Sequence, residues 1–134
     1  MSPKSLMAEA VRARAASHSP YSRFAVGAAL LTASGRIVHG CNVENASYGL
    51  TCCAERTAVF KAVSDGERRF VAIAVTARDG QGAPPCGACR QVMAEFAPDL
   101  DVYWRDRRGR IVHRSLRALL PNLFDFVKEG GKPR

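Results

Sequence analysis

The sequence predicts a single α/β domain in which helices cover a β-sheet. Its 134 residues fit one domain with one sizeable core. Helical and strand-like patterns follow one another in the order helix, strand, strand, helix, strand, helix, strand, strand. The run FVAIAVTA at 70–77 is apolar at almost every position, which is typical of a strand buried on both faces of a sheet.

The first third of the chain predicts one helix and one β-hairpin. Several residues near the start recur at helical spacing and predict an amphipathic helix: Leu6 or Met7, Ala10, Val11 and Arg14. A turn-rich break follows, and then two strand candidates, 24–32 and 37–44, flank the turn ASGR.

The remaining elements alternate helices and strands. A helix is expected from Cys53 to about Val63, and the strand 70–77 comes after it. The later segments are a helix at 86–97, strands at 100–106 and 110–116, a short closing segment at 117–124 and a frayed tail at about 128–134. With no internal repeat or composition break, residues 1–134 are expected to form one domain.

Composition excludes several classes of protein. No apolar stretch approaches the roughly 18 residues that span a bilayer. Five cysteines, an odd number, without an export signal disfavour a disulfide framework and favour a metal or catalytic role, so a cytoplasmic protein is expected. The net charge of +8 would suit a nucleic-acid partner. However, the basic residues are scattered, and their one dense cluster, 105–110, is better interpreted as a solvated hairpin turn.

Two cysteine motifs open two of the predicted helices. Helix N-termini stabilise thiolates, which are the form of cysteine that binds zinc. Cys86 and Cys89 are one helical turn apart, and Cys53 would be a third ligand from the other helix. Three protein ligands leave a position for water, as in catalytic zinc sites. Glu55 lies two residues beyond Cys53, close enough to accept a proton from that water.

The cysteines allow two other interpretations. The pair in CGAC can form a redox couple, or it can be half of a four-cysteine structural zinc site completed by Cys52 or Cys41. A redox couple does not require the upstream C-A-E, and a structural site leaves Glu55 without a role. The combined pattern therefore favours catalytic zinc.

The sequence resembles the small cytidine deaminases that form homotetramers. The pattern C-A-E followed by P-C-x-x-C is the signature of zinc nucleobase deaminases, with Cys53 in place of a histidine. The resemblance covers nearly the whole chain through PYSRFAVGAALL (20–31), GCNVENASYG (40–49), CAERTA (53–58), PCGACRQ (85–91) and LLPNLF (119–124). It implies a five-stranded mixed β-sheet with helices on both faces, a three-layer α/β/α fold.

The resemblance also implies an activity and a set of roles. The expected reaction is hydrolytic deamination of cytidine and 2′-deoxycytidine to uridine and 2′-deoxyuridine, with release of ammonia, in pyrimidine salvage. Zinc-bound hydroxide would attack C4 while Glu55 shuttles protons, and Cys53, Cys86 and Cys89 would hold one zinc ion per subunit. The implied substrate contacts are Asn42 and Glu44 to the ribose, Phe24 against the nucleoside, Ala54 to the base, and Ala46, Tyr48 and Phe124 at a neighbouring subunit's site.

Arg56 has a role that electrostatics predicts. Three thiolates on Zn²⁺ sum to a charge of −1, and a guanidinium beside the sulfurs would offset it. Cys52 and Cys41 are interpreted as small packing residues. The three histidines, His18, His39 and His113, lie outside the motifs and are assigned no role.

Three rival functions share part of the pattern. Blasticidin S deaminase has C-A-E and P-C-x-x-C-R-Q, but NVENASYG and Arg56 favour plain nucleosides. A nucleic-acid editing deaminase would need an open groove, so a nucleic-acid partner is not expected. A non-catalytic zinc or redox module would tolerate loss of Glu55. After Phe124 the chain departs from its relatives, so Phe126 could compete for the closing position.

Overall fold

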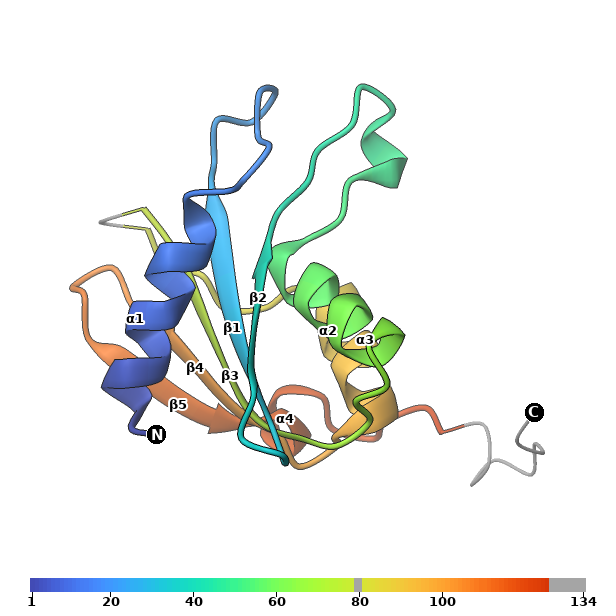
Figure 1. Cartoon of the computed structure of the whole chain (residues 1–134). Coiled ribbons are helices and arrows are strands. Elements are labelled where there is room, and N and C mark those ends of the chain that lie inside the picture. The colour runs from blue at the N-terminus through green and yellow to red at the C-terminus, as the bar shows by residue number, and fades with distance from the viewer. Residues whose placement is uncertain (79–80, 126–134) are drawn as a thin grey trace.

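The computed structural model describes residues 1–78 and 81–125, and it has one β-sheet between helices on both faces (Figure 1). The elements are α1 (Pro3–Arg14), β1 (Val26–Thr32), β2 (Ile37–Cys41), a 3₁₀ turn η1 (Tyr48–Leu50), α2 (Ala54–Ser64), β3 (Phe70–Ala77), α3 (Gly87–Phe96), β4 (Asp101–Arg105), β5 (Ile111–Ser115) and α4 (Leu116–Leu119). The predicted order of helices and strands is confirmed. Phe126 and the tail expected at about 128–134 lie outside the described residues.

The sheet has the mixed five-stranded topology that the resemblance implied. Its strand order is β2-β1-β3-β4-β5. β3 and β4 are parallel, and α3 lies in the connection between them, while the other neighbouring strands are antiparallel. A parallel pair needs such a crossover, because the chain must return to the starting edge of the sheet.

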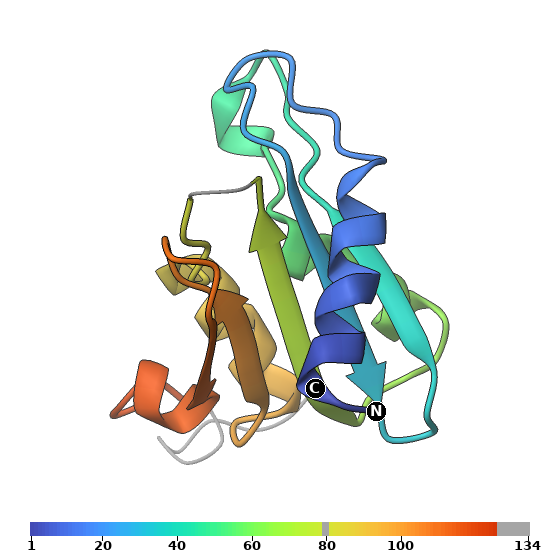
Figure 2. The same cartoon turned by 90° about the vertical axis from the view of Figure 1, so that its left-hand side faces the viewer.

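The two faces of the sheet carry different helices. Among the described residues, α1 is the only helix on one face of the sheet (Figure 2). Its Leu6, Met7 and Ala10 are buried against Ala29 and Ala74 of the strands. α2 and α3 pack on the other face over a larger core, whose fully buried members include Leu30, Val59, Ile73 and Met93. In the described part of the chain, no helix is long and apolar enough to cross a membrane.

Gly40 lets α2 lie directly on β2. A Cβ atom at this position would lie 2.3 Å from the carbonyl oxygen of Ala54 and 2.6 Å from the amide nitrogen of Ala58. Both atoms belong to the backbone of α2, so they cannot move aside as a flexible side chain can. The close approach fixes the first turn of α2, which carries the C-A-E motif, over the sheet.

The hairpin strands are shorter than the sequence predicts. β1 begins at Val26 and not at residue 24, because the backbone of Phe24 bonds to side chains: its N–H donates to the Ser22 hydroxyl, and its carbonyl accepts from the Asn42 amide. β2 ends at Cys41 and not at residue 44, because Val43 leaves the sheet to form isolated bridges with His18 and Cys52.

Two predictions of burial need correction or refinement, and one prediction of a turn is confirmed. Val11 is 41% exposed, and Ala13 faces the core of α1 in its place. Val71 is also exposed, so β3 is buried on both faces at every position except one. The basic cluster at 105–110 does form the predicted hairpin turn, where Asp106 accepts hydrogen bonds from the backbone of Arg108 and Arg110.

Candidate active site and metal centre

The site is built on the starts of α2 and α3. Cys53 is the N-cap of α2 and Cys86 is the N-cap of α3, so each stands one residue before the helix rather than in it. The Cys86 sulfur accepts a hydrogen bond from the N–H of Cys89 at 3.5 Å, as a capping side chain does. The unpaired N–H groups and partial positive charge of both helix starts therefore face the cysteines.

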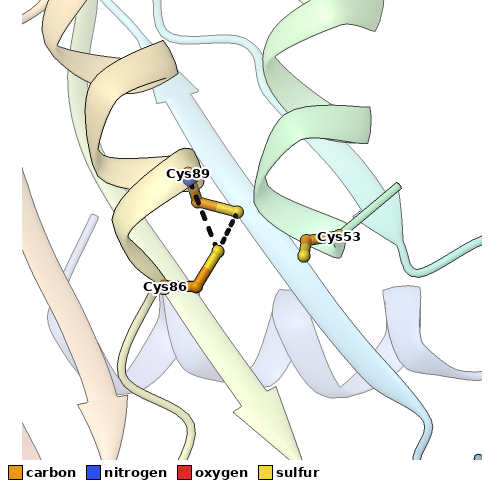
Figure 3. A group of neighbouring side chains, drawn as sticks. All are labelled: Cys53, Cys86 and Cys89. Carbon is orange, nitrogen blue, oxygen red and sulfur yellow. Dashed lines mark hydrogen bonds between the residues drawn. The ribbon is translucent and has the colours of Figure 1, made fainter. Parts of the chain in front are cut away.

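The three predicted ligands meet in space although 33 residues separate Cys53 from Cys86. The sulfurs of Cys53, Cys86 and Cys89 all lie within 4.8 Å of one another (Figure 3). Cys89 lies in the first turn of α3 and Cys86 caps that helix, with 3.4 Å between their sulfurs, and Cys53 caps α2. Zn–S bonds of about 2.3 Å in a tetrahedral site place sulfurs about 3.8 Å apart, so the group fits a zinc ion.

The charge of the sulfur cluster also points to a cation. A hydrogen bond from Cys89 and the nearby Arg56 guanidinium lower the pKa of the Cys53 thiol to about 5. The same Cys53 sulfur and burial raise the pKa of the Cys89 thiol. Cys53 is thus readily ionised while Cys89 is not, and a bound divalent cation is what would let the Cys89 thiol ionise beside it.

Arg56 lies beside the sulfurs, as its predicted role requires. Its Nη2 donates to the Cys53 sulfur at 3.3 Å, and the hydrogen bonds to Cys53 and Cys89 raise the pKa of the guanidinium. Its Nε is buried and has no hydrogen-bond partner among the described residues. The side chain is therefore held against the cluster and is not a solvated helix residue.

Glu55 is a buried carboxyl group in the first turn of α2. It is only 5% exposed, and burial raises its pKa to about 7. The negative charge of Cys53 adds to this increase. A carboxyl group with a pKa near neutrality can both accept and donate a proton, which suits general acid–base chemistry.

A cavity of about 200 Å³ joins Glu55 to most of the predicted substrate contacts. Its walls include Phe24, Asn42, Glu44, Cys53, Ala54 and Glu55. Five other residues line the cavity without having been predicted as site residues: Ser22, Val26, Thr51, Val75 and Ala83. Ser22 lies within the quoted motif PYSRFAVGAALL, but nothing in the sequence indicates where its hydroxyl points.

Asn42 and Glu44 are held by the loop that precedes β1. The Asn42 amide donates to the carbonyl of Phe24 at 2.7 Å and accepts from the N–H of Val26 at 2.9 Å. Glu44 accepts from the N–H groups of Tyr21 and Ser22, both at 3.0 Å, and from the Ser22 hydroxyl. These bonds lower the pKa of Glu44, so it is a carboxylate at neutral pH.

Three predicted contacts lie away from this cavity. Ala46, Tyr48 and Phe124 are exposed and are not among its wall residues. Tyr48 is 73% exposed, and its ring meets that of Tyr21 edge to face, with 5.8 Å between the ring centroids. It lines a neighbouring cavity together with Glu44. The backbone carbonyl of Phe124 accepts a hydrogen bond from Gln91 at 3.5 Å.

Three close thiols and a buried carboxyl group beside a small cavity define a metal-dependent hydrolytic centre. The model of the cytidine and deoxycytidylate deaminase zinc-binding region matches residues 1–104, and the chain belongs to this family. The family is zinc-binding, and Cys53, Cys86 and Cys89 are a group that could hold the ion.

Individual relatives agree with this assignment over almost the whole chain. A cytidine deaminase from Halalkalibacterium halodurans is 54% identical over 125 residues, which are 92% of this chain and 95% of that protein. One from Mycobacterium tuberculosis is 52% identical over 122 residues, 89% of this chain and 86% of that one. The crystal structure of a Burkholderia pseudomallei cytidine deaminase matches with a TM-score of 0.88 at 49% identity, covering 92% of this chain and 100% of that chain.

Proposed function

We propose that this enzyme hydrolyses cytidine and 2′-deoxycytidine to uridine and 2′-deoxyuridine and releases ammonia. The observation that carries the proposal is the cavity itself, where Glu55 and Cys53 share walls with the nucleoside contacts Phe24, Asn42 and Glu44. Pyrimidine salvage is the corresponding role. We place the enzyme in the reducing cytoplasm, because the proposed site needs three reduced cysteines.

Cys53, Cys86 and Cys89 would hold the zinc ion. When bound, zinc supplies Lewis acidity that makes water a usable nucleophile near neutral pH. Arg56 donates to the Cys53 sulfur and offsets the negative charge of the three thiolates. The N-termini of α2 and α3 add to this positive potential.

Glu55 carries the protons of the reaction. It accepts a proton from the water that attacks C4 and delivers it to N3 of the pyrimidine. It then takes the second proton of that water, from the hydroxyl now bonded to C4, and delivers it to the amino group, so the C4–N bond breaks, ammonia leaves and a carbonyl remains at C4. A pKa of about 7, raised by burial, is well placed for a group that must take up and release a proton in each turnover.

The other wall residues would bind the nucleoside. Asn42 and Glu44 offer an amide and a carboxylate to the ribose hydroxyls, and the Phe24 ring packs against the nucleoside. Ala54 at the start of α2 would contact the base through its backbone. All four residues border the same cavity as Glu55.

We further propose a homotetramer whose neighbours complete each site. Large apolar side chains remain exposed on this chain: Tyr48, Leu50, Phe60 and Phe124. Ala46, Tyr48 and Phe124 would reach the neighbouring site, which fits their position outside the cavity of their own chain. Size-exclusion chromatography with light scattering should give four times the 14.5 kDa chain mass. Phe60→Glu should dissociate the assembly, and a monomeric parent protein would contradict it.

Two rival substrates are less well supported by the geometry. The cavity of about 200 Å³ matches a small molecule better than a nucleic-acid strand, which needs an open groove. Blasticidin S contains cytosine but is not a plain nucleoside, whereas Asn42 and Glu44 are polar groups suited to a ribose diol. The activity assay should therefore include blasticidin S and single-stranded DNA beside cytidine.

The test is to follow the absorbance change as cytidine becomes uridine and to measure zinc in the same samples. Glu55→Gln should lose at least about a thousandfold in kcat while retaining one zinc per chain. Glu67→Gln is the matched control, because Glu67 is only partly buried and does not border the cavity, and it should behave like the parent. A zinc-loaded parent that leaves cytidine unchanged would refute the proposed activity.

A further inference from the structure

Ser22 stands at the boundary between two cavities. The inner one, of about 200 Å³, is the nucleoside cavity described above. The outer one, of about 340 Å³, is lined by Tyr21, Ser22, Glu44, Tyr48 and Thr51. Ser22, Glu44 and Thr51 border both cavities, so the Glu44 carboxylate lies where the two meet.

The hydroxyl of Ser22 connects the proposed ribose contact to the aromatic contact. It donates to Oε2 of Glu44 and accepts from the N–H of Phe24 at 3.0 Å. Oε1 of Glu44 accepts from two N–H groups, those of Tyr21 and Ser22. The orientation of the carboxylate is therefore set by the short loop 21–22. Among the described residues, Ser22 is the only one whose side chain forms a hydrogen bond with it.

Counting lone pairs shows what remains for a ligand. A carboxylate offers about four acceptor sites. The loop takes both sites of Oε1, and the Ser22 hydroxyl takes one of Oε2. One acceptor site is left, on Oε2, and the single hydrogen of the Ser22 hydroxyl is already committed to that oxygen. Glu44 can thus receive one hydroxyl donor, from a direction that the bond to Ser22 determines.

We propose that Ser22 is a positioning residue that sets ribose recognition by aiming Oε2 of Glu44 at one sugar hydroxyl. The inference rests on the proposed function, in which Glu44 binds the ribose. Ser22 does not touch the reacting atoms and acts through Glu44. It should therefore affect the binding of substrates that carry that hydroxyl and leave the chemical step unchanged.

The test compares sugar analogues on the zinc-loaded protein. Ser22→Ala should raise KM for cytidine about tenfold with kcat within about twofold, because the carboxylate loses a charge-assisted hydrogen bond and rotates. With 2′,3′-dideoxycytidine, which lacks both hydroxyls of the ribose diol, kcat/KM should be the same for the variant and the parent. 2′-Deoxycytidine and 3′-deoxycytidine then identify which hydroxyl is read.

Three further variants keep the test decisive. Ser22→Thr retains the hydroxyl at an exposed position and should restore the parent KM. Ser19→Ala removes a hydroxyl from the same loop that borders neither cavity, and it should leave both constants within about twofold. If Ser22→Ala lowers the melting temperature too far to assay, Ser22→Cys keeps the size with a weaker donor.

The outcomes separate this inference from the activity on which it rests. A parent that deaminates cytidine, together with a Ser22→Ala variant that loses equally on cytidine and on the dideoxy analogue, would show a structural role and overturn the inference alone. A parent without cytidine deaminase activity would overturn the proposed function instead. A tenfold loss in kcat/KM that is confined to substrates with a 2′ or 3′ hydroxyl supports both the inference and the proposed function.

Discussion

Arg90 donates from Nη1 to the carbonyl oxygen of Leu119 at 2.8 Å, and its Nε donates to the carbonyl of Pro85 at the same distance. Pro85 immediately precedes Cys86, and Leu119 ends α4, from which the chain continues to Phe124. One guanidinium therefore joins the loop that ends at Cys86 to the closing segment 117–124. Its planar guanidinium donates to the two carbonyls from two different nitrogens in fixed directions, a geometry that the single nitrogen of a lysine does not reproduce.

Replacing Arg90 with Met should damage both stability and catalysis. Two carbonyls lose a charged donor, so the free energy of unfolding should fall by about 1–3 kcal/mol and kcat/KM by at least about tenfold. Chemical denaturation and cytidine turnover measure the two effects. Arg117→Met is the matched control, because Arg117 forms an exposed ion pair with Asp99, and it should cost less than about 1 kcal/mol. Equal losses of stability and of kcat/KM in the two variants would contradict the proposal that Arg90 joins the two segments.

Adjacent cysteines should differ completely in their effect on zinc. Cys53→Ala removes one of the three sulfurs that lie within 4.8 Å of one another, so bound zinc should fall from one ion per chain to nearly none. Cys52→Ala leaves that group intact and should retain the full ion. Metal analysis after dialysis against a weak chelator compares them. Zinc lost equally from both would favour the structural four-cysteine site that includes Cys52.

A methyl group on Gly40 should disturb the site from the back of α2. The added carbon would meet the backbone of Ala54 and Ala58, so Gly40→Ala should lower the free energy of unfolding by at least about 2 kcal/mol and weaken zinc retention. Gly49→Ala meets nothing within 4 Å and should change stability by less than about 0.5 kcal/mol. Urea denaturation of the pair checks the prediction, and a neutral Gly40→Ala would contradict the close packing.

The turn between β4 and β5 should carry a pH-dependent contribution to stability. Backbone and guanidinium donors of Arg110 lower the pKa of Asp106 below its ordinary value of 3.8. Because the folded state then holds its proton less tightly than the unfolded state, the carboxylate stabilises the fold above that pH, and the contribution disappears as the pH falls through the lowered pKa. Asp106→Asn should melt a few degrees below the parent at pH 7, with the gap closing below about pH 4. A gap that is independent of pH would assign the effect to shape instead of charge.

The pairing of Cys86 with Cys89 and the position of Glu55 beside Cys53 were predictable from the sequence because their signals are local. Cys86 and Cys89 are one helical turn apart, and Glu55 follows Cys53 by two residues, so helix geometry alone groups them. The meeting of α2 with α3 is not local. It depends on the crossover from β3 to β4, whose parallel pairing no short pattern reveals.

Strand boundaries were less predictable for a related reason. The predicted strands 24–32 and 37–44 extend as far as their apolar patterns do. The first strand begins later, because the side chains of Ser22 and Asn42 replace strand partners at Phe24. The second strand ends earlier, because Val43 forms bridges outside the sheet. Bonds between side chain and backbone across 18 residues leave no periodic trace. The same lack of a trace concealed Ser22 as a wall residue of the cavity.

The anchoring of the loop before β1 has a consequence for the order of folding. Residues 17–24 are synthesised before β1. The side chains that hold them belong to Asn42 and Glu44, which follow β2 in the sequence. Local pairing of β1 with β2 must bring those anchors back before the loop can settle, since its ordering is rewarded only once they arrive. During synthesis, residues 17–24 therefore cannot be anchored by these side chains until about twenty further residues have been added to the chain.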